Sequence, residues 1–278
     1  MKKIAFFDID GTMINVPNNI IHPTSETMRV LNEFKQQKNY IVVATARGSV
    51  PSSIQDIDFD GYIFNDGHYI IFNNQVWIDD IFTKDEIAKQ MAAYKKYDGK
   101  SMFGGHELSW CACPDDPMVT NHREMFSGTS ARPANLIEKF EIEDVEAISC
   151  CVLFKTIEQL QACYDELKED FTIVPYYTGL IRMDVYKKGF TKGTACKYMF
   201  EKLGIPKKTV MLLVMVSMIK KCFSLLVMVL QWAMPLMKLK QLVMILLIVL
   251  ITMVLPKHFI NILKSSQKHL LFNIRGVL

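Results

Sequence analysis

Short apolar runs that end in polar residues alternate with an amphipathic stretch near the start of the chain. Residues 4–7 form a continuous apolar run that ends at Asp8, and residues 40–44 form a β-rich run that ends at Thr45. Between them, residues 27–37 carry apolar side chains at helical spacing behind a helix-start signal. A strand, a helix and a second strand in this order predict a right-handed crossover, with the two strands parallel and side by side.

Further short strands extend this pattern as far as residue 81, and the order of predicted elements changes at Phe82. Residues 61–64 predict a third strand, and the runs on either side of Asn73-Asn74 predict a hairpin. From residue 82, helices and strands follow one another without βαβ regularity, which is typical of an α+β insertion. The insertion is predicted to hold helices at 83–97 and 154–170, strands at 147–153 and 171–177, and short strands and loops at 98–133.

The pattern therefore predicts an α/β fold in three segments. A parallel-sheet core begins at residues 1–81, is interrupted by the α+β insertion at 82–182, and resumes at 183–278. A strand-like run at 181–185 and a helix start at Lys192 mark the return to the core.

Composition adds a cellular compartment to this picture. The chain has 278 residues, half of them hydrophobic, which suits one large domain or two ordinary ones. Its seven cysteines include the adjacent pair Cys150-Cys151 and fit neither a disulfide ladder nor a zinc-ligand pattern. The apolar run after the first two lysines breaks at Asp8, too early for a signal peptide. We therefore expect reduced thiols and a cytoplasmic protein.

The net charge of +3 hides an uneven distribution. All 29 acidic residues lie at or before Glu201, and the rest of the chain carries only basic charges. These basic side chains are scattered among aliphatic residues, without the clustering or aromatic interleaving that binds nucleic acid. We therefore expect no nucleic-acid partner.

Polar side chains gather where the predicted core strands end. Asp8 and Asp10 follow the first strand at i, i+2, and Thr45 follows the second. In an open α/β sheet the ligand crevice lies beyond these strand ends, where one carboxylate can attack phosphorus and another can move a proton. Lys192 opens a helix, where a phosphate would be held. The alternatives are an Asp-Gly hairpin turn and a solvated lysine in a lysine-rich loop.

Other polar positions have ordinary structural explanations. Taken alone, Asn65-Asp66-Gly67 is typical of a turn. His106 and His122 lie in the insertion, and we expect them to be surface or packing histidines rather than metal ligands.

Four stretches share their residues with known motifs: Phe7-Asp8-Ile9-Asp10-Gly11-Thr12; Ala44-Thr45-Ala46-Arg47, with alanine for the usual glycine; Asn65-Asp66-Gly67, with one residue altered; and Lys192-Gly193-Thr194-Ala195. Together they resemble the haloacid dehalogenase superfamily, and within it the Cof-type sugar-phosphate phosphatases, over roughly residues 1–208. The resemblance implies a Rossmann-like core with an inserted α+β cap.

The same resemblance implies a Mg²⁺-dependent phosphatase that acts through an aspartyl-phosphate. Asp8 would be the nucleophile and Asp10 the general acid/base, and both carboxylates would bind Mg²⁺. Thr45 and Lys192 would hold the phosphate. Arg47 and Asn65 would lie on the substrate side.

The fourth motif of that superfamily, a strand ending in Gly-Asp-Gly-x-x-Asp, is absent. A methionine-rich aliphatic stretch begins at Thr209 instead. Methionine has a single codon, so this stretch limits which residues a shifted reading frame would encode. In that frame each codon consists of the last base of one codon and the first two bases of the next. There Met215-Val216 forces Gly, Met218-Ile219 forces Asp, and the run from Met211 permits Ala-Phe-Gly-Asp-Gly-Val-Asn-Asp-Lys-Glu-Met-Phe.

Later codons in the shifted frame also give residues that the superfamily shows. Trp232-Ala233 and Met253-Val254 force Gly, and Met237-Lys238 forces Glu. We infer that residues 209–278 are translated out of frame from near Val210, and expect them to be poorly specified. The alternative is a membrane-associated tail. Its uncharged stretches, 222–237 and 241–256, are shorter than the roughly 20 residues needed to span a bilayer.

The predicted function is hydrolysis of a small phosphomonoester such as a sugar phosphate, impaired by loss of the fourth motif. A phosphomutase of the same superfamily would share the aspartyl-phosphate step. A non-catalytic phosphate-binding protein is the alternative from another class. We expect the cap to close over the substrate and its loops at 103–117 and 126–133 to select the leaving group.

Overall fold

The computed structural model describes residues 1–15, 18–127 and 135–213. These residues belong to one compact unit, Met1–Met218, and a second unit, Ile219–Leu278, lies outside the described part. The predictions of an out-of-frame, poorly specified tail and the membrane alternative therefore fall almost entirely outside the described residues. Within the described ranges, no helix is long and apolar enough to cross a membrane.

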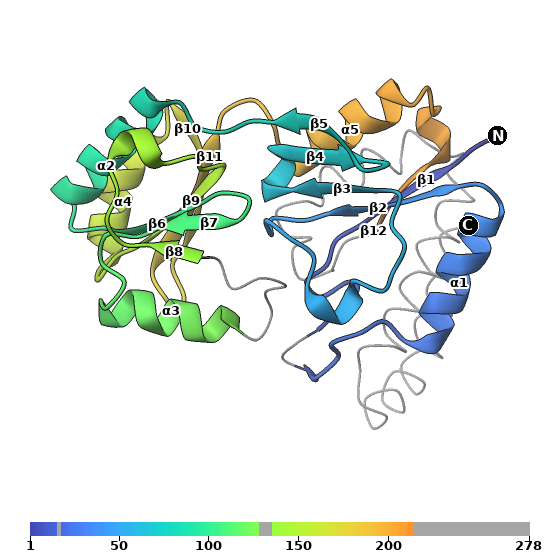
Figure 1. Cartoon of the computed structure of the whole chain (residues 1–278), viewed down its shortest axis with the longest axis horizontal. Coiled ribbons are helices and arrows are strands. Elements are labelled where there is room, and N and C mark those ends of the chain that lie inside the picture. Colours follow the sequence, from blue (N-terminus) through green and yellow to red (C-terminus); the bar gives the residue numbers. More distant parts are fainter. Residues whose placement is uncertain (16–17, 128–134, 214–278) are drawn as a thin grey trace, which may run out of the picture. The chain divides into compact units, whose positions relative to one another are not determined.

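In the described part of the chain, six strands form the first sheet, in the order β12-β1-β2-β3-β4-β5 (Figure 1). The first four run parallel, and the β1–β2 pair confirms the prediction from the βαβ pattern. The strands β4 and β5 form an antiparallel hairpin. Asn73 and Asn74 at its turn have φ values of 47° and 60°, as tight hairpin turns require. The strands are β1 Ile4–Phe7, β2 Tyr40–Ala44, β3 Gly61–Phe64, β4 Tyr69–Phe72, β5 Gln75–Asp79 and β12 Val210–Leu213.

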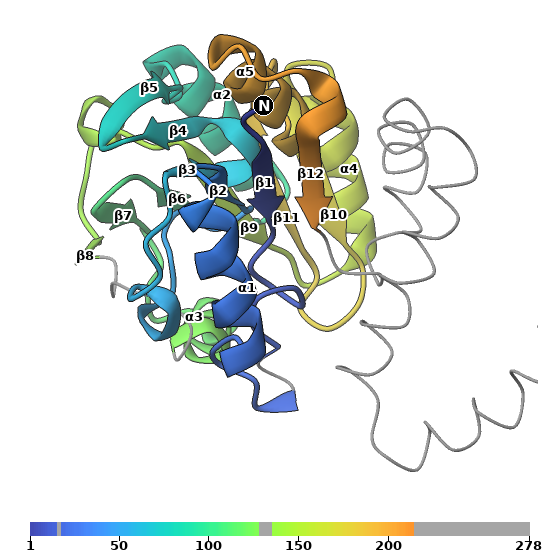
Figure 2. The ribbon, with the colours of Figure 1, turned by 90° about the vertical axis from the view of Figure 1, so that its right-hand side faces the viewer.

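Alternate residues of β1 enter two different hydrophobic clusters, one on each face of the sheet. Ile4 and Phe6 pack in the cluster of α5, whereas Ala5 and Phe7 pack in the cluster of α1. Burial on both faces explains why the apolar run of β1 is continuous. The helices are α1 Ser25–Gln36, capped by Thr24, and α5 Lys192–Lys202, capped by Thr191. Figure 2 shows β12 beside β1.

The second sheet has the order β10-β11-β9-β6-β7-β8 and is antiparallel except for the β7–β8 pair. Ile87 of α2 and Leu160 of α4 join Phe103 and Val152 in its core. This sheet and its helices confirm the predicted α+β cap. Its elements are α2 Lys84–Lys96, β6 Lys100–Gly104, β7 Leu108–Trp110, α3 Pro117–Ser127, β8 Asn135–Ile137, β9 Ser149–Leu153, α4 Ile157–Leu167, β10 Phe171–Tyr176 and β11 Arg182–Lys187.

Two features of the cap differ from the sequence prediction. Residues 117–127 form the helix α3, where we predicted short strands and loops. Its first residue is Pro117. Proline is tolerated at the first position of a helix, because an N–H at this position would have no partner within the helix. The strand β11 pairs with β9 and β10 as far as Lys187, so the second sheet continues beyond the boundary that we predicted after residue 182. Short 3₁₀ helices complete the described part: Ser52–Ile54, Asn65–Gly67, Ile142–Asp144 and Lys207–Thr209.

Candidate active site

Asp8 follows β1 directly, and its side chain is almost completely buried, with 5% exposed. Its Oδ1 accepts a hydrogen bond from Ile9 N at 2.9 Å and lies 3.3 Å from Lys192 Nζ. Burial raises the pKa of Asp8, and the positive charge of Lys192 opposes this rise. Lys192, at the start of α5, therefore favours the ionised form of the buried Asp8 carboxylate.

Asp10 lies two residues further on and is about half exposed. Arg47 donates from Nε to Asp10 Oδ2 at 2.7 Å and from a terminal nitrogen to Oδ1 at 2.6 Å. This two-pronged pair joins the loop after β1 to the loop after β2. Thr45, which is buried, accepts a hydrogen bond on Oγ1 from Arg47 N at 3.2 Å. Asp10, Thr45 and Arg47 are thus held together.

The β3 loop, Asn65–Gly67, follows the third parallel strand. Asn65 and Asp66 have left-handed φ values of 48° and 52°. Their backbone N–H groups donate to Arg47 O at 3.0 Å and to Thr45 O at 3.1 Å, respectively. The Asp66 carboxylate lies 3.8 Å from Lys192 Nζ. The loop therefore contacts the residues after β2 and the lysine that pairs with Asp8.

All six predicted site residues lie at the ends of three neighbouring strands or at the first residue of α5. The contacts connect them in two groups, one around the Asp8–Lys192 pair and one around the Asp10–Arg47 pair. Their chemical roles stay predictions. The six residues are Asp8, Asp10, Thr45, Arg47, Asn65 and Lys192.

Polar residues of the cap sheet, which the sequence analysis missed, also lie near the β3 loop. Ser149 Oγ donates to Asn65 Oδ1 at 3.4 Å. Burial raises the pKa of Asp184, the Arg182 guanidinium opposes this, and the negative charge of Asp66 adds to the rise. The sequence did contain a signal, because Asp184 is a carboxylate inside an otherwise strand-like run. A charged residue in such a strand could have indicated that the strand faces the site.

Replacing Asp184 with asparagine is expected to stabilise the fold at neutral pH. The raised pKa means that the folded state binds its proton more tightly than the unfolded state does. Stability is therefore lost as pH rises from about 4 through the folded pKa. Thermal unfolding of the full chain at several pH values should show the variant above the parent at pH 7, with the gap closing near pH 4.

The matched control for that experiment is Asp115→Asn, which removes an exposed carboxylate from the loop between β7 and α3 of the cap. We expect its unfolding temperature to follow the parent at every pH. If Asp184→Asn were less stable than the parent at pH 7, the attraction of Arg182, whose Nε lies 3.9 Å from Asp184 Oδ1, would outweigh the cost of burial.

The two cap histidines make packing contacts. His106 Nε2 lies 3.0 Å from Asp79 Oδ1, and its ring lies 4.1 Å from that of Tyr69. His122 Nε2 lies 3.5 Å from Cys151 Sγ, and burial lowers the pKa of His122 to about 4. Of the two loops predicted to select the leaving group, 126–133 falls largely outside the described residues.

Asp8 and Asp10 offer the donor chemistry that Mg²⁺ prefers. The ion takes hard oxygen ligands and is commonly bound through one or two carboxylates and a substrate phosphate. In the same loop, the Thr12 hydroxyl is buried without a partner among the described residues. No group of three or more metal-binding side chains occurs in the described ranges. The two carboxylates therefore fit part of a Mg²⁺ coordination shell.

The chain is similar to known proteins in sequence and fold. The chain matches the family of haloacid dehalogenase-like hydrolases over residues 5–213. YkrA of Bacillus subtilis (strain 168), a candidate phosphatase, is 24% identical over 213 residues, which cover 73% of this chain and 75% of that protein.

Solved structures of low sequence identity have a similar fold. The HAD subclass IIB sugar phosphatase BT4131 has a TM-score of 0.62 at 23% identity, covering 76% of this chain and 80% of that chain. The phosphatase BT1666 from Bacteroides thetaiotaomicron has a TM-score of 0.63 at 18% identity, covering 76% of each chain. The family match spans both sheets and the six predicted site residues, and this chain belongs to the haloacid dehalogenase-like hydrolases.

Proposed function

We propose that this hydrolase acts on a small phosphomonoester, such as a sugar phosphate, through an aspartyl-phosphate on Asp8. The observation that carries the proposal is the buried Asp8 carboxylate paired with Lys192 at 3.3 Å. The pair lies where the ligand crevice of an open α/β sheet is found. Lys192 is also the first residue of α5, where backbone N–H groups favour a phosphate.

In this proposal Asp8 Oδ2 is the attacking oxygen, because Oδ1 already accepts a hydrogen bond from Ile9 N and faces Lys192. Oδ2 bonds to phosphorus as the bond to the leaving-group oxygen breaks, and Asp10 gives that oxygen a proton. Water then attacks the phosphorus and gives a proton back to Asp10. The products are the alcohol, inorganic phosphate and the free Asp8 carboxylate.

Arg47 connects substrate binding to this proton transfer. Without substrate it holds both carboxylate oxygens of Asp10. A guanidinium binds phosphate with the same two-pronged geometry as it binds a carboxylate. We expect Arg47 to move from Asp10 to the phosphate oxygens, which lets Asp10 take up a proton from water and pass it to the leaving-group oxygen.

Asp8 and Asp10 would hold Mg²⁺, whose charge would offset that of the phosphate. In the chain as translated, no acidic residue follows Glu201, so the ligand set that these two carboxylates begin lacks its expected acids. We therefore expect weak metal binding and low turnover from this chain.

The cap side of the site supports a leaving group with several hydroxyls. Ser149, Tyr176 and Asp184 bring hydroxyl and carboxylate oxygens to the cap sheet near Asn65 and Asp66. Such groups hydrogen-bond to hydroxyls and discriminate strongly against substrates that lack them. This chemistry agrees with the sugar phosphatase activity that is given for BT4131.

The cysteines support a cytoplasmic location. Those in the described residues are free thiols. Disulfides are rare where thiols are kept reduced, as in the cytoplasm.

Incubation with a sugar monophosphate distinguishes the alternatives. We expect free inorganic phosphate, lost when Mg²⁺ is removed by a chelator. An isomeric sugar phosphate would instead identify a phosphomutase. Binding of inorganic phosphate without any turnover, by both this chain and a frame-restored version, would identify a non-catalytic binding protein.

A further inference from the structure

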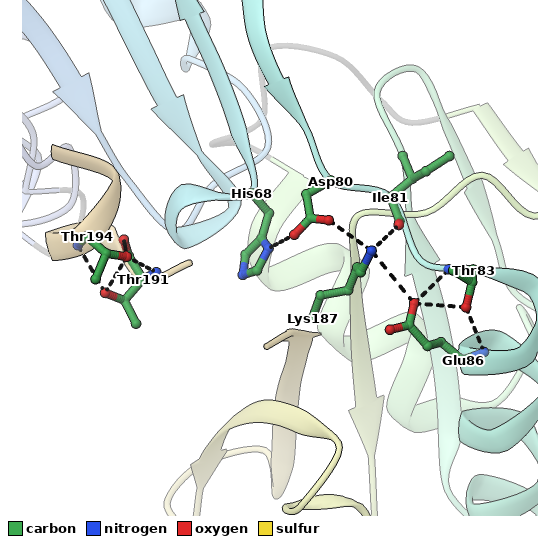
Figure 3. Close-up of polar contacts among 8 residues, drawn as sticks. All are labelled: His68, Asp80, Ile81, Thr83, Glu86, Lys187, Thr191 and Thr194. Carbon is green, nitrogen blue, oxygen red and sulfur yellow. Dashed lines mark hydrogen bonds and ion pairs between the residues drawn. The ribbon is translucent and has the colours of Figure 1, made fainter. Parts of the chain in front are cut away.

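His68 follows the β3 loop directly and is completely buried. Its Nδ1 lies 2.9 Å from Asp80 Oδ2 (Figure 3). Its carbonyl accepts a hydrogen bond from Asp80 N at 2.9 Å. The ring stacks on Tyr186, with centroids 5.7 Å apart. Nε2 is buried without a partner among the described residues. In the neutral ring the proton therefore lies on Nδ1, where the carboxylate accepts it.

Asp80 extends this contact to both connections between the two sheets. It follows β5 directly, in the first connection, and its Oδ1 lies 2.9 Å from Lys187 Nζ. Lys187 ends β11, where the second connection begins. Its ammonium also donates to Ile81 O at 3.1 Å and lies 3.9 Å from Glu86 Oε2 (Figure 3). Because Glu86 belongs to the capping box of α2, one lysine joins both connections to a cap helix.

The β3 loop touches the second connection at another point. A Cβ built on Gly67 would lie 2.8 Å from Thr191 O and 2.9 Å from Ala195 Cβ. Thr191 caps α5 together with Thr194 (Figure 3), and Lys192 is the first residue of the helix. The loop is therefore packed between His68 on one side and the start of the lysine-bearing helix on the other.

Such close packing matters because the backbone of the loop is strained. Left-handed φ values at Asn65 and Asp66 persist only where the surroundings impose them. The carbonyls after β2 hold one end of the loop. At the other end, His68 N donates to Asn65 O at 3.3 Å, and Gly67 packs against Thr191 and Ala195.

We propose that His68, Asp80 and Lys187 form a hinge clamp, in which the Lys187 ammonium holds the β3 loop in its strained conformation. Lys187 is a positioning residue that touches no reacting atom. Its side chain is 21% exposed and that of Asp80 is 23% exposed, so the pair is partly shielded from water. Without the ammonium, Asp80 turns toward water and releases His68. The proposal does not depend on the phosphatase activity.

Amide hydrogen exchange of the full chain tests the clamp. In Lys187→Met, we expect the amides of Asn65, Asp66 and His68 to exchange about tenfold faster. The variant lacks the charged hydrogen bond that holds the loop in this proposal, so the loop should open more often. The amide of Asp80, which donates to His68 O, should accelerate with them. Lys187→Arg should restore slow exchange, since it keeps the cation.

The matched control is Lys188→Met, which removes the next lysine, a donor to Glu169 O. We expect it to leave the β3 loop unchanged. Faster exchange in Lys187→Met that is confined to residues 80–86 and 187–191 would overturn the proposal, because it would show a local tether only. An equal effect of Lys188→Met on the loop would overturn it too.

A measurement on the unmodified chain covers the case in which Lys187→Met does not fold. Nitrogen NMR of the histidine rings should show His68 with its proton on Nδ1 in the neutral form. A neutral His68 with its proton on Nε2 would overturn the clamp, because Nδ1 could then not donate to Asp80.

Discussion

Restoring the alternative reading frame near codons 209–212 is expected to raise Mg²⁺-dependent phosphatase activity by about 10³-fold. The structure supplies a geometric reason. Residues Val210–Leu213 form β12, parallel to β1, and Leu213 O accepts a hydrogen bond from Asp8 N at 3.0 Å. The last described residue of β12 therefore lies beside Asp8. In the alternative frame the permitted residues there are Gly-Asp-Gly-Val-Asn-Asp, whose carboxylates would join Asp8 and Asp10 around Mg²⁺.

The magnitude follows from what a fully coordinated metal contributes. Charge stabilisation by a bound metal is worth several kcal/mol, and each 1.36 kcal/mol changes a rate about tenfold. Phosphate release by the original and restored chains, with and without a chelator, measures the gain. The nucleotide sequence around codons 208–212 is the first control. A sequence that does not encode the motif in any frame, or a restored protein that is equally inactive, would count against the frameshift.

The core was predictable because its signals are local. A strand buried on both faces has a continuous apolar run, so β1 and β2 were located from residues 4–7 and 40–44. The helix α3 was not predicted, because Pro117 was taken as a loop residue although it can begin a helix. The end of β11 was also missed. Its last residue, Lys187, lies in a lysine-rich stretch whose strand pairing is set by β10 and β9.

The candidate site also has a part that the local sequence predicts and a part that it does not. Asp8, Asp10 and Thr45 end predicted strands, so their position follows from the sheet alone. The contacts from the cap depend on the tertiary fold instead. Ser149 and Asn65 are 84 positions apart, and no local pattern announces their hydrogen bond. Likewise, an Asp80–Lys187 pair joins two connections that are adjacent only in the folded chain.

Replacing Asp8 with asparagine in the frame-restored protein is expected to lower turnover by about 10³-fold or more. The change removes the only atom that can bond to phosphorus in the proposed first step, and loss of a covalent nucleophile has effects of at least this size. The amide keeps the size of the side chain and an oxygen that can accept from Ile9 N. We therefore expect the variant to fold.

Binding and turnover should separate in this variant. Lys192 and Thr45 remain, so inorganic phosphate should still bind, as titration calorimetry can measure, while phosphate release from a sugar phosphate is lost. Asp58→Asn, at a highly exposed carboxylate, is the matched control and should keep both properties. Full turnover in Asp8→Asn would exclude Asp8 as the nucleophile. Loss of phosphate binding together with turnover would instead assign Asp8 a role in holding the site, because the ammonium of Lys192 would then need its carboxylate partner to stay in place.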